Sequence, residues 1–245
     1  ASIGLTQMSL IWAVVIFAAV MRAFTGFGFA LAAVPVFSLF MLPTEAVVLS
    51  AGLTLAVSLL TLKSYWGQYP LRPMLPMVGM SLLGTVVGAW ALRHISPEQF
   101  KLWIGLAVIG ACIALGFFKP RKREPAPLLG APVGLGSGLL NGAFAIPGPP
   151  IIIYAMATEN DPQRSRALLM TFFLFSAIVA LASYATAGFI TAYSPWLFAL
   201  AFPAMFLGDK LGFYLFYRFG GAFYRRVALA MLFAVGMAIT ARALL

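Results

Sequence analysis

Two polar side chains lie at matching places in an otherwise apolar chain, each shortly before a cluster of helix-breaking residues. Arg22 precedes the letters TGFGF, and Asn141 precedes AIPGPP. Glycine lets the backbone approach a ligand closely, and proline can end one helix and begin the next. The free N–H groups at a helix N-terminus carry partial positive charge and bind anions. The pattern therefore predicts a site for a small oxyanion, whether carboxylate, sulfonate or phosphate.

Each of these features also has a purely structural interpretation. An arginine inside an apolar segment is a functional candidate, but a long side chain near a helix end can also extend to the membrane surface. Asn141 can donate to an oxyanion or cap a helix. The glycines and prolines can serve only close packing and kinks. Two breaks at equivalent positions favour the substrate site.

Two further ionisable residues are candidates. Arg166 begins a long apolar run, where it would either attract anions at the inner mouth or anchor the topology. Asp209, next to Lys210, is a candidate for proton coupling or for a structural ion pair. One histidine and one cysteine provide no metal cluster and no Cys/His nucleophile. We expect no enzyme, no metal and no cofactor.

The elements that must position these residues are membrane helices. Of 245 residues, 62% are hydrophobic and only 9% are charged, whereas a soluble domain carries about a quarter charged residues. The chain is therefore predicted to be an all-α polytopic membrane protein. Its net charge of +10 comes from basic residues at the ends of apolar runs, where lipid headgroups lie. Nucleic acid is not an expected partner.

The apolar runs predict about ten transmembrane helices, since about 20 residues cross a bilayer. Some of them are short or re-entrant, and two pairs read as broken helices, 5–24 with 27–41 and 128–142 with 147–158. The expected spans are 5–24, 27–41, 44–63, 72–93, 98–118, 128–142, 147–158, 165–187, 195–215 and 222–243.

The basic residues predict the orientation of these spans. With the N-terminus outside, all of them except Arg93, Lys101 and Arg242 fall at the cytoplasmic side. This distribution follows the positive-inside rule. We therefore expect a multi-pass protein of a bacterial inner membrane, with both termini on the periplasmic side.

A shift of the sequence by about half its length aligns the two breaks. The predicted halves are 1–118 and 128–245, joined by a basic cytoplasmic linker, 119–127. Each half holds five spans, so the second must enter the membrane in the opposite orientation. Glycine pairs GTVVG (84–88) and GDKLG (208–212) lie in equivalent spans and predict close helix packing. Inverted repeats with broken helices are a recurring architecture of secondary transporters.

The two broken regions resemble the paired signatures of the TauE/SafE family of sulfite and organosulfur anion transporters. The similarity is carried by RAFTGFGFALAAVPVF, by NGAFAIPGPPIIIYAM and by SRALLMTFFLF. The chain departs from the family's glycine-rich pattern at Ala23 and Ala145. The resemblance implies that Arg166 lies near the inner gate. It also implies that the anion site is formed by Arg22, Thr25, Gly26, Phe27, Gly28, Asn141, Gly148, Pro149 and Pro150.

The sequence and the resemblance together predict a secondary-active transporter that works by alternating access. Its substrate would be a small sulfur oxyanion, such as sulfite or a sulfonate like sulfoacetate. The alternatives are a passive anion channel and a carrier of small carboxylates. The expected partners are this anion, the lipid bilayer and a coupling proton; no oligomeric state is predicted.

Overall fold

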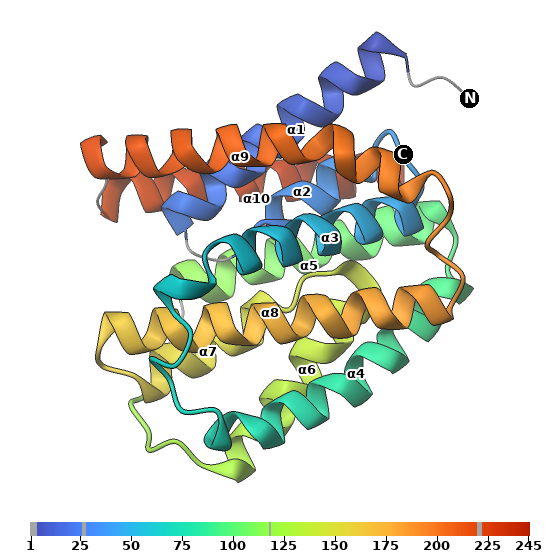
Figure 1. The fold of residues 1–245 in the computed structure, drawn as a ribbon. Helices are drawn as coiled ribbons and strands as arrows, with labels where there is room; N and C mark the ends of the chain where they lie inside the picture. Colours follow the sequence, from blue (N-terminus) through green and yellow to red (C-terminus); the bar gives the residue numbers. More distant parts are fainter. Residues whose placement is uncertain (1–3, 26–27, 118, 220–221) are drawn as a thin grey trace.

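The computed structural model describes residues 4–25, 28–117, 119–219 and 222–245. Every regular element in these segments is helical, as predicted. Two short 3₁₀ helices, η1 (Leu62–Ser64) and η2 (Arg72–Met74), accompany ten α-helices (Figure 1). The α-helices are α1 (Leu5–Thr25), α2 (Ala30–Phe37), α3 (Pro43–Leu60), α4 (Leu75–His94), α5 (Pro97–Phe117), α6 (Pro127–Phe144), α7 (Gly148–Thr158), α8 (Pro162–Thr186), α9 (Ser194–Phe219) and α10 (Ala222–Leu244).

Seven of the described helices are long and apolar enough to cross a membrane. The other three are α2, α6 and α7. The helices α2 and α7 have eight and eleven residues and extend only about 12 Å and about 17 Å at 1.5 Å per residue, and the apolar part of α6, Leu128–Phe144, is also shorter than the seven spans. The prediction that some of the ten helices are short is therefore confirmed. The structure shortens the expected span 27–41 to α2, which is followed by turns at 38–41.

The main helix pairs of the bundle are α1 with α9, α4 with α6, α5 with α10, and α3 with α8. Glycines allow two of these pairs to approach closely. A Cβ atom at Gly84 would lie 2.6 Å from the carbonyl oxygen of Leu135 on α6, and one at Gly208 would lie 2.8 Å from Cβ of Ala19 on α1. The predicted packing role of these glycines is confirmed.

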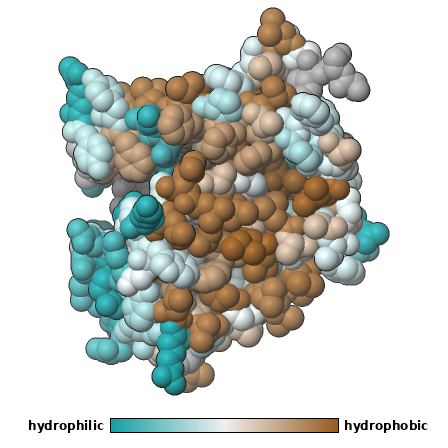
Figure 2. Space-filling model, viewed as in Figure 1, coloured by the Kyte–Doolittle hydropathy of each residue, from teal (hydrophilic) through white to brown (hydrophobic). Residues whose placement is uncertain are grey.

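The surface has a polar edge and a broad apolar face. Figure 2 shows hydrophilic residues along the left edge of the molecule and hydrophobic residues over much of the remaining face. In Figure 1 that left edge carries the end of α9, the turn between α7 and α8, and the segment 119–126. The start of α1 and the end of α10 lie toward the opposite edge (Figure 1). An apolar band between polar edges is the surface that a bilayer requires.

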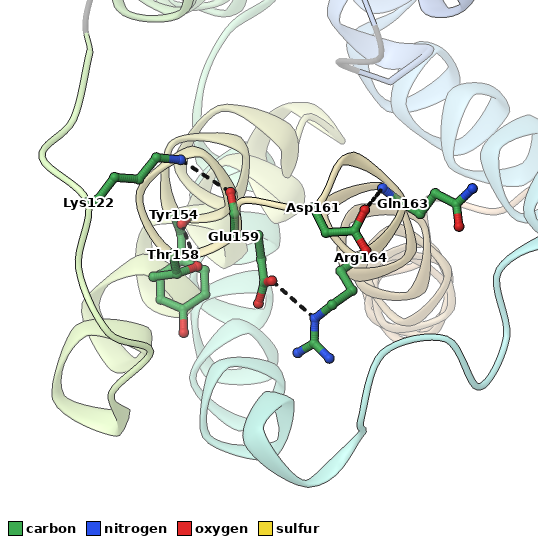
Figure 3. Close-up of polar contacts among 7 residues, drawn as sticks. All are labelled: Lys122, Tyr154, Thr158, Glu159, Asp161, Gln163 and Arg164. Atoms are coloured by element: carbon green, nitrogen blue, oxygen red, sulfur yellow. Dashed lines mark hydrogen bonds and ion pairs between the residues drawn. The ribbon is translucent and has the colours of Figure 1, made fainter.

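The segment between α5 and α6 is fixed to the C-terminal end of α7. Lys122 Nζ donates to the carbonyl oxygen of Glu159 at 3.2 Å (Figure 3). It also donates to the carbonyl oxygen of Met156 at 2.7 Å, and the backbone N–H of Arg123 donates to the carbonyl oxygen of Ala157 at 2.8 Å. A cation at this end interacts favourably with the helix dipole and with carbonyls that have no partner inside the helix. This basic segment therefore holds the short helix α7 at the polar edge.

Candidate functional site

The first break separates α1 from α2. The backbone of Gly28 has φ +94°, a left-handed value that glycine adopts without strain, and α2 begins two residues later. Thr25 ends α1, but its side chain lies outside the described part of the chain. The predicted site residues Gly26 and Phe27 also lie outside the described residues.

The second break separates α6 from α7. Ala145 has φ +57°, and the N–H groups of Ala145 and Ile146 donate to the carbonyls of Asn141 (2.8 Å) and Leu140 (3.2 Å). This left-handed ending closes α6 in the way that glycine usually does. Gly148 begins α7, and Pro149 and Pro150 occupy its first turn, where a missing N–H costs no helix bond.

The structure brings the two breaks together around a cavity of about 40 Å³. Arg22 and Gly28 line it from the first break, and Ala145 and Gly148 line it from the second. The N-terminal ends of α2 and α7 therefore meet in the interior of the bundle, beside the Arg22 side chain. Pro149 and Pro150 do not line this cavity.

A larger cavity, of about 720 Å³, adjoins the junction. Arg22 and Gly28 line both cavities, and Arg166 lines the larger one. Nη2 of Arg166 donates to Oγ of Ser64 at 3.4 Å, which joins α8 to η1. The remaining polar lining comes from residues that the sequence did not single out: Ser64, Gln68, Gln163 and Ser165.

The position of these polar residues indicates where the larger cavity opens. Ser64 and Gln68 follow α3, while Gln163, Ser165 and Arg166 belong to the first turns of α8. Both segments lie at the polar edge of the molecule, where the end of α7 and the segment 119–126 also lie (Figures 1 and 3). The cavity thus connects that edge to the junction of the two breaks.

A buried tyrosine connects the segment after α3 back to that helix. The hydroxyl of Tyr65 donates to the carbonyl of Ser58 at 2.6 Å. Burial raises the pKa of the Tyr65 hydroxyl, and the positive charge of Arg22 opposes this effect without reversing it. The phenol therefore stays protonated at neutral pH and keeps its donor.

Arg22 is ion-paired across the bundle. Its Nη1 lies 2.6 Å from Oδ1 of Asp209 on α9, and the two side chains are 15% and 19% exposed. Lys210, the neighbour of Asp209 in the sequence, does not form this pair, since its Nζ lies 4.4 Å from the ring centre of Phe206. The charge of Arg22 is therefore balanced by a residue from the other half of the chain.

Asn141 occupies a different environment from Arg22. Its side-chain nitrogen donates to Oγ1 of Thr85 (3.1 Å) and to the carbonyl of Ser176 (2.9 Å), and it does not line either cavity. The hydroxyl of Tyr184 donates to the carbonyls of Asn141 and Gly142. In this conformation Asn141 joins α4, α6 and α8, and its role as an anion donor stays a prediction.

These observations define the class of the molecule: an all-α polytopic membrane protein with two broken helices that meet beside an arginine-lined cavity. The family model described as "Sulfite exporter TauE/SafE" matches residues 11–239. The chain therefore belongs to the TauE/SafE family of sulfite exporters, as the resemblance implied. No match to curated proteins or to solved structures was found.

Membership in this family indicates transport across a membrane as the general role of the chain. Among the described residues, no three His, Cys, Asp or Glu side chains are grouped so that they could hold a metal ion. The groups that the cavity does contain are cations, amides and hydroxyls, and these are the groups that bind oxyanions.

Proposed function

We propose that the protein is a secondary-active transporter of a small sulfur oxyanion, sulfite or a sulfonate, and that it works by alternating access. The observation that carries this proposal is the position of Arg22. It lies at the end of the large cavity and also at the junction where α2 and α7 begin. An anion that enters the cavity reaches a guanidinium and two helix N-termini at one place.

The electrostatics of this place favour an anion. Each helix N-terminus is equivalent to about half a positive charge, and its first N–H groups have no partner inside the helix. Guanidinium can form two parallel hydrogen bonds with an oxyanion. We assign the binding role to Arg22, Gly28 and Gly148, and we keep Thr25, Gly26 and Phe27 in this role on the family resemblance alone. Pro149 and Pro150 set the start of α7, and Arg166 serves the inner gate.

The arrangement of the helices supports two inverted repeats, 1–118 and 128–245. The contact of α1 with α9 corresponds to that of α6 with α4, and α1 contacts α2 as α6 contacts α7. The pairs α5 with α10 and α3 with α8 each join corresponding helices. We propose that the halves rock around the junction.

The polar edge corresponds to the cytoplasmic side of a bacterial inner membrane in this proposal, with the linker 119–127 on that side and both termini on the periplasmic side. The large cavity then opens inward. Export of an anion without an accompanying proton would be favoured by the inside-negative potential, at about 2.3 kcal/mol per charge and per 100 mV.

The proposal is tested by counterflow in proteoliposomes. Vesicles loaded with unlabelled sulfite should accumulate labelled sulfite transiently, and Arg22→Gln should remove this signal. Arg242→Gln is the matched control, because Arg242 is an exposed arginine in the last turn of α10. Methanesulfonate and acetate as competitors distinguish a sulfonate carrier from a carboxylate carrier. Flux without counterflow, with single-channel conductance, would instead establish a passive channel.

A further inference from the structure

Two side-chain contacts hold the broken helices α1 and α6 in the same way. Arg22 lies three residues before the end of α1, and Asn141 lies three residues before the end of α6. Arg22 bonds to Asp209 on α9, and Asn141 bonds to Thr85 on α4. Asp209 and Thr85 each follow the first glycine of the motifs GDKLG and GTVVG. The two contacts therefore occupy corresponding places in the two halves.

The backbone packing around both contacts is also alike. Gly208 and Gly212 of α9 lie against the backbone of α1, and Gly84 and Gly88 of α4 lie against that of α6. In one half a neutral hydrogen bond completes this packing. The same helix packing is thus achieved in one half without any charge. Helix packing therefore does not explain why the other half carries an arginine and an aspartate.

The charged contact differs from the neutral one in its access to space. Asn141 is 2% exposed and Thr85 is fully buried, and neither lines a described cavity near the breaks. Arg22 lines both the large cavity and the junction. Asp209, the partner of Arg22, lines neither of these two cavities. It lines a separate cavity of about 250 Å³ between α3 and α9.

We propose that Asp209 is a resident carboxylate that occupies Arg22 until the substrate anion displaces it, and that the displaced carboxylate then takes up a proton. This inference rests on the proposed function and deepens it. In the empty protein Arg22 and Asp209 cancel each other's charge. If an oxyanion joined them without a proton, one uncompensated negative charge would remain inside the membrane, which is costly.

The exchange balances in charge and atoms. The anion and one proton enter, the guanidinium changes its partner from the aspartate to the anion, and the aspartate becomes a neutral carboxylic acid. The loaded and the empty site then carry the same net charge. The proton has its own entry through the cavity between α3 and α9, while the anion enters through the large cavity.

The charged surroundings of Asp209 are few in the described part of the chain. Arg22 faces Asp209 from α1, and Lys210 is the next residue along α9. Arg166 of α8 acts electrostatically on Arg22. The α3 wall of the cavity next to Asp209 contributes Val57, Leu60 and Thr61, of which none titrates. Asp209 is therefore the carboxylate in this group, and a proton that accompanies the anion is assigned to it.

The experiment is a calorimetric titration of the purified full chain with methanesulfonate, and with sulfite as a second probe. Methanesulfonate has no group that titrates near neutral pH, so that any proton bound must be taken up by the protein. Titrations in buffers of different ionisation enthalpy give the number of protons. The wild type should take up about one proton per anion, and its affinity should rise about tenfold per pH unit as the pH falls from 8 to 6.

Asp209→Asn removes the carboxylate that competes with the anion for Arg22, so that the state with Arg22 free to bind is no longer a minor one. This variant should bind methanesulfonate about tenfold more tightly than the wild type at pH 7. Its binding should show neither proton uptake nor pH dependence. Asp209→Glu should restore the proton uptake. Arg218→Gln is the matched control on the same helix, because Arg218 is exposed and lines none of these cavities, and it should behave as the wild type. The pH series on the wild type provides a test even if Asp209→Asn does not fold.

The outcomes separate the two proposals. Binding of methanesulfonate by the wild type, with the same affinity from pH 6 to 8 and no proton uptake, would overturn the exchange and leave the proposed transport function standing. Binding by Asp209→Asn alone would support the exchange, since it would show that the carboxylate blocks Arg22. If neither probe binds to wild type or variant, the proposed function fails, and the exchange fails with it.

Discussion

Arg22 and Asp209, separated by 187 positions in the sequence, form an ion pair of 2.6 Å between α1 and α9. The pair joins the break of the first half to α9, the fourth helix of the second half. Side chains that are only 15% and 19% exposed are poorly solvated, so that either charge alone would lack compensation. The pair is therefore both a tie between the halves and the charge balance of the proposed site.

A double-mutant cycle should detect this coupling as a change in thermal stability. Arg22→Gln and Asp209→Asn should each lower the melting temperature, because each leaves one charge without its partner. The double variant should recover part of the loss, with a coupling free energy of about 1–3 kcal/mol. Thermal melting in detergent is measured for the wild type, the two single variants and the double variant.

The control cycle uses Arg164 and Glu159, which form a bridge of 3.2 Å in which the arginine is 48% and the glutamate 8% exposed. Because solvent screens the half-exposed arginine, this bridge should contribute about 0–1 kcal/mol, so that the cycle should show less coupling than the Arg22–Asp209 cycle. Additive losses in the Arg22–Asp209 cycle would mean that the two charges are stabilised by other groups.

Much of the fold was predictable from the sequence because the helix ends are marked locally. Proline at or near the first position fixes the starts of α3, α5, α7 and α8, and the apolar runs between them set the lengths. The glycine pairs likewise indicated which helices pack closely. Each of these features is recognised from residues that lie close together in the sequence, and for this reason it could be predicted.

The partners of Arg22 and Asn141 were not predictable in this way. Asp209 and Thr85 are remote in the sequence, and each is chosen by how the helices pair in space. The polar residues at the mouth of the cavity, Ser64 and Gln68, lie in η1 and in the turn after it, and neither belongs to a recognisable motif. Their role follows from the approach of this segment to α8.

Replacing Ala145 by glycine should stabilise the protein. Ala145 has φ +57°, and a residue with a Cβ atom in the left-handed region costs roughly 1 kcal/mol more than glycine. Ala145→Gly should therefore raise the melting temperature by about 2–4 °C for a chain of this size. Differential scanning fluorimetry measures the change.

The control for this substitution is Ala143→Gly, two residues earlier inside α6. Glycine in a helix interior costs about 1 kcal/mol relative to alanine, so that this variant should melt at a lower temperature. Equal shifts in the two variants would contradict the conformational explanation, since only the backbone geometry distinguishes the two sites.

Gly138→Ala should strongly destabilise the contact between α4 and α6. A Cβ atom at Gly138 would lie 2.8 Å from Cα of Ser81, and it would also meet the Ser81 carbonyl group. Backbone atoms cannot rotate away, so the helices must separate at a cost of about 3 kcal/mol. A loss of folded protein, seen by size-exclusion chromatography and by melting, is expected.

Gly110→Ala is the matched control, because a Cβ atom at Gly110 of α5 would meet no atom within 4 Å. Its melting temperature should stay the same or rise slightly, as alanine favours the helix. A similar loss in both variants would indicate a general sensitivity of the helices to alanine and not a close helix contact.

Arg166→Gln should weaken transport from the side on which the large cavity opens. Arg166 lines that cavity and contacts Ser64, while Arg164 lies outside the cavity, bonded to Glu159 and 5.2 Å from the ring centre of Tyr69 (Figure 3). A cation about 4 Å from an anion in water changes binding about fivefold. Arg166→Gln should therefore raise the KM for sulfite about fivefold, with kcat unchanged, and it should reduce the dependence of KM on salt. Initial rates in oriented vesicles, with sulfite offered from each side, measure this effect; Arg164→Gln should leave KM unaltered. An equal rise in KM for both variants would mean that net surface charge attracts the substrate, and that Arg166 has no specific place at the inner gate.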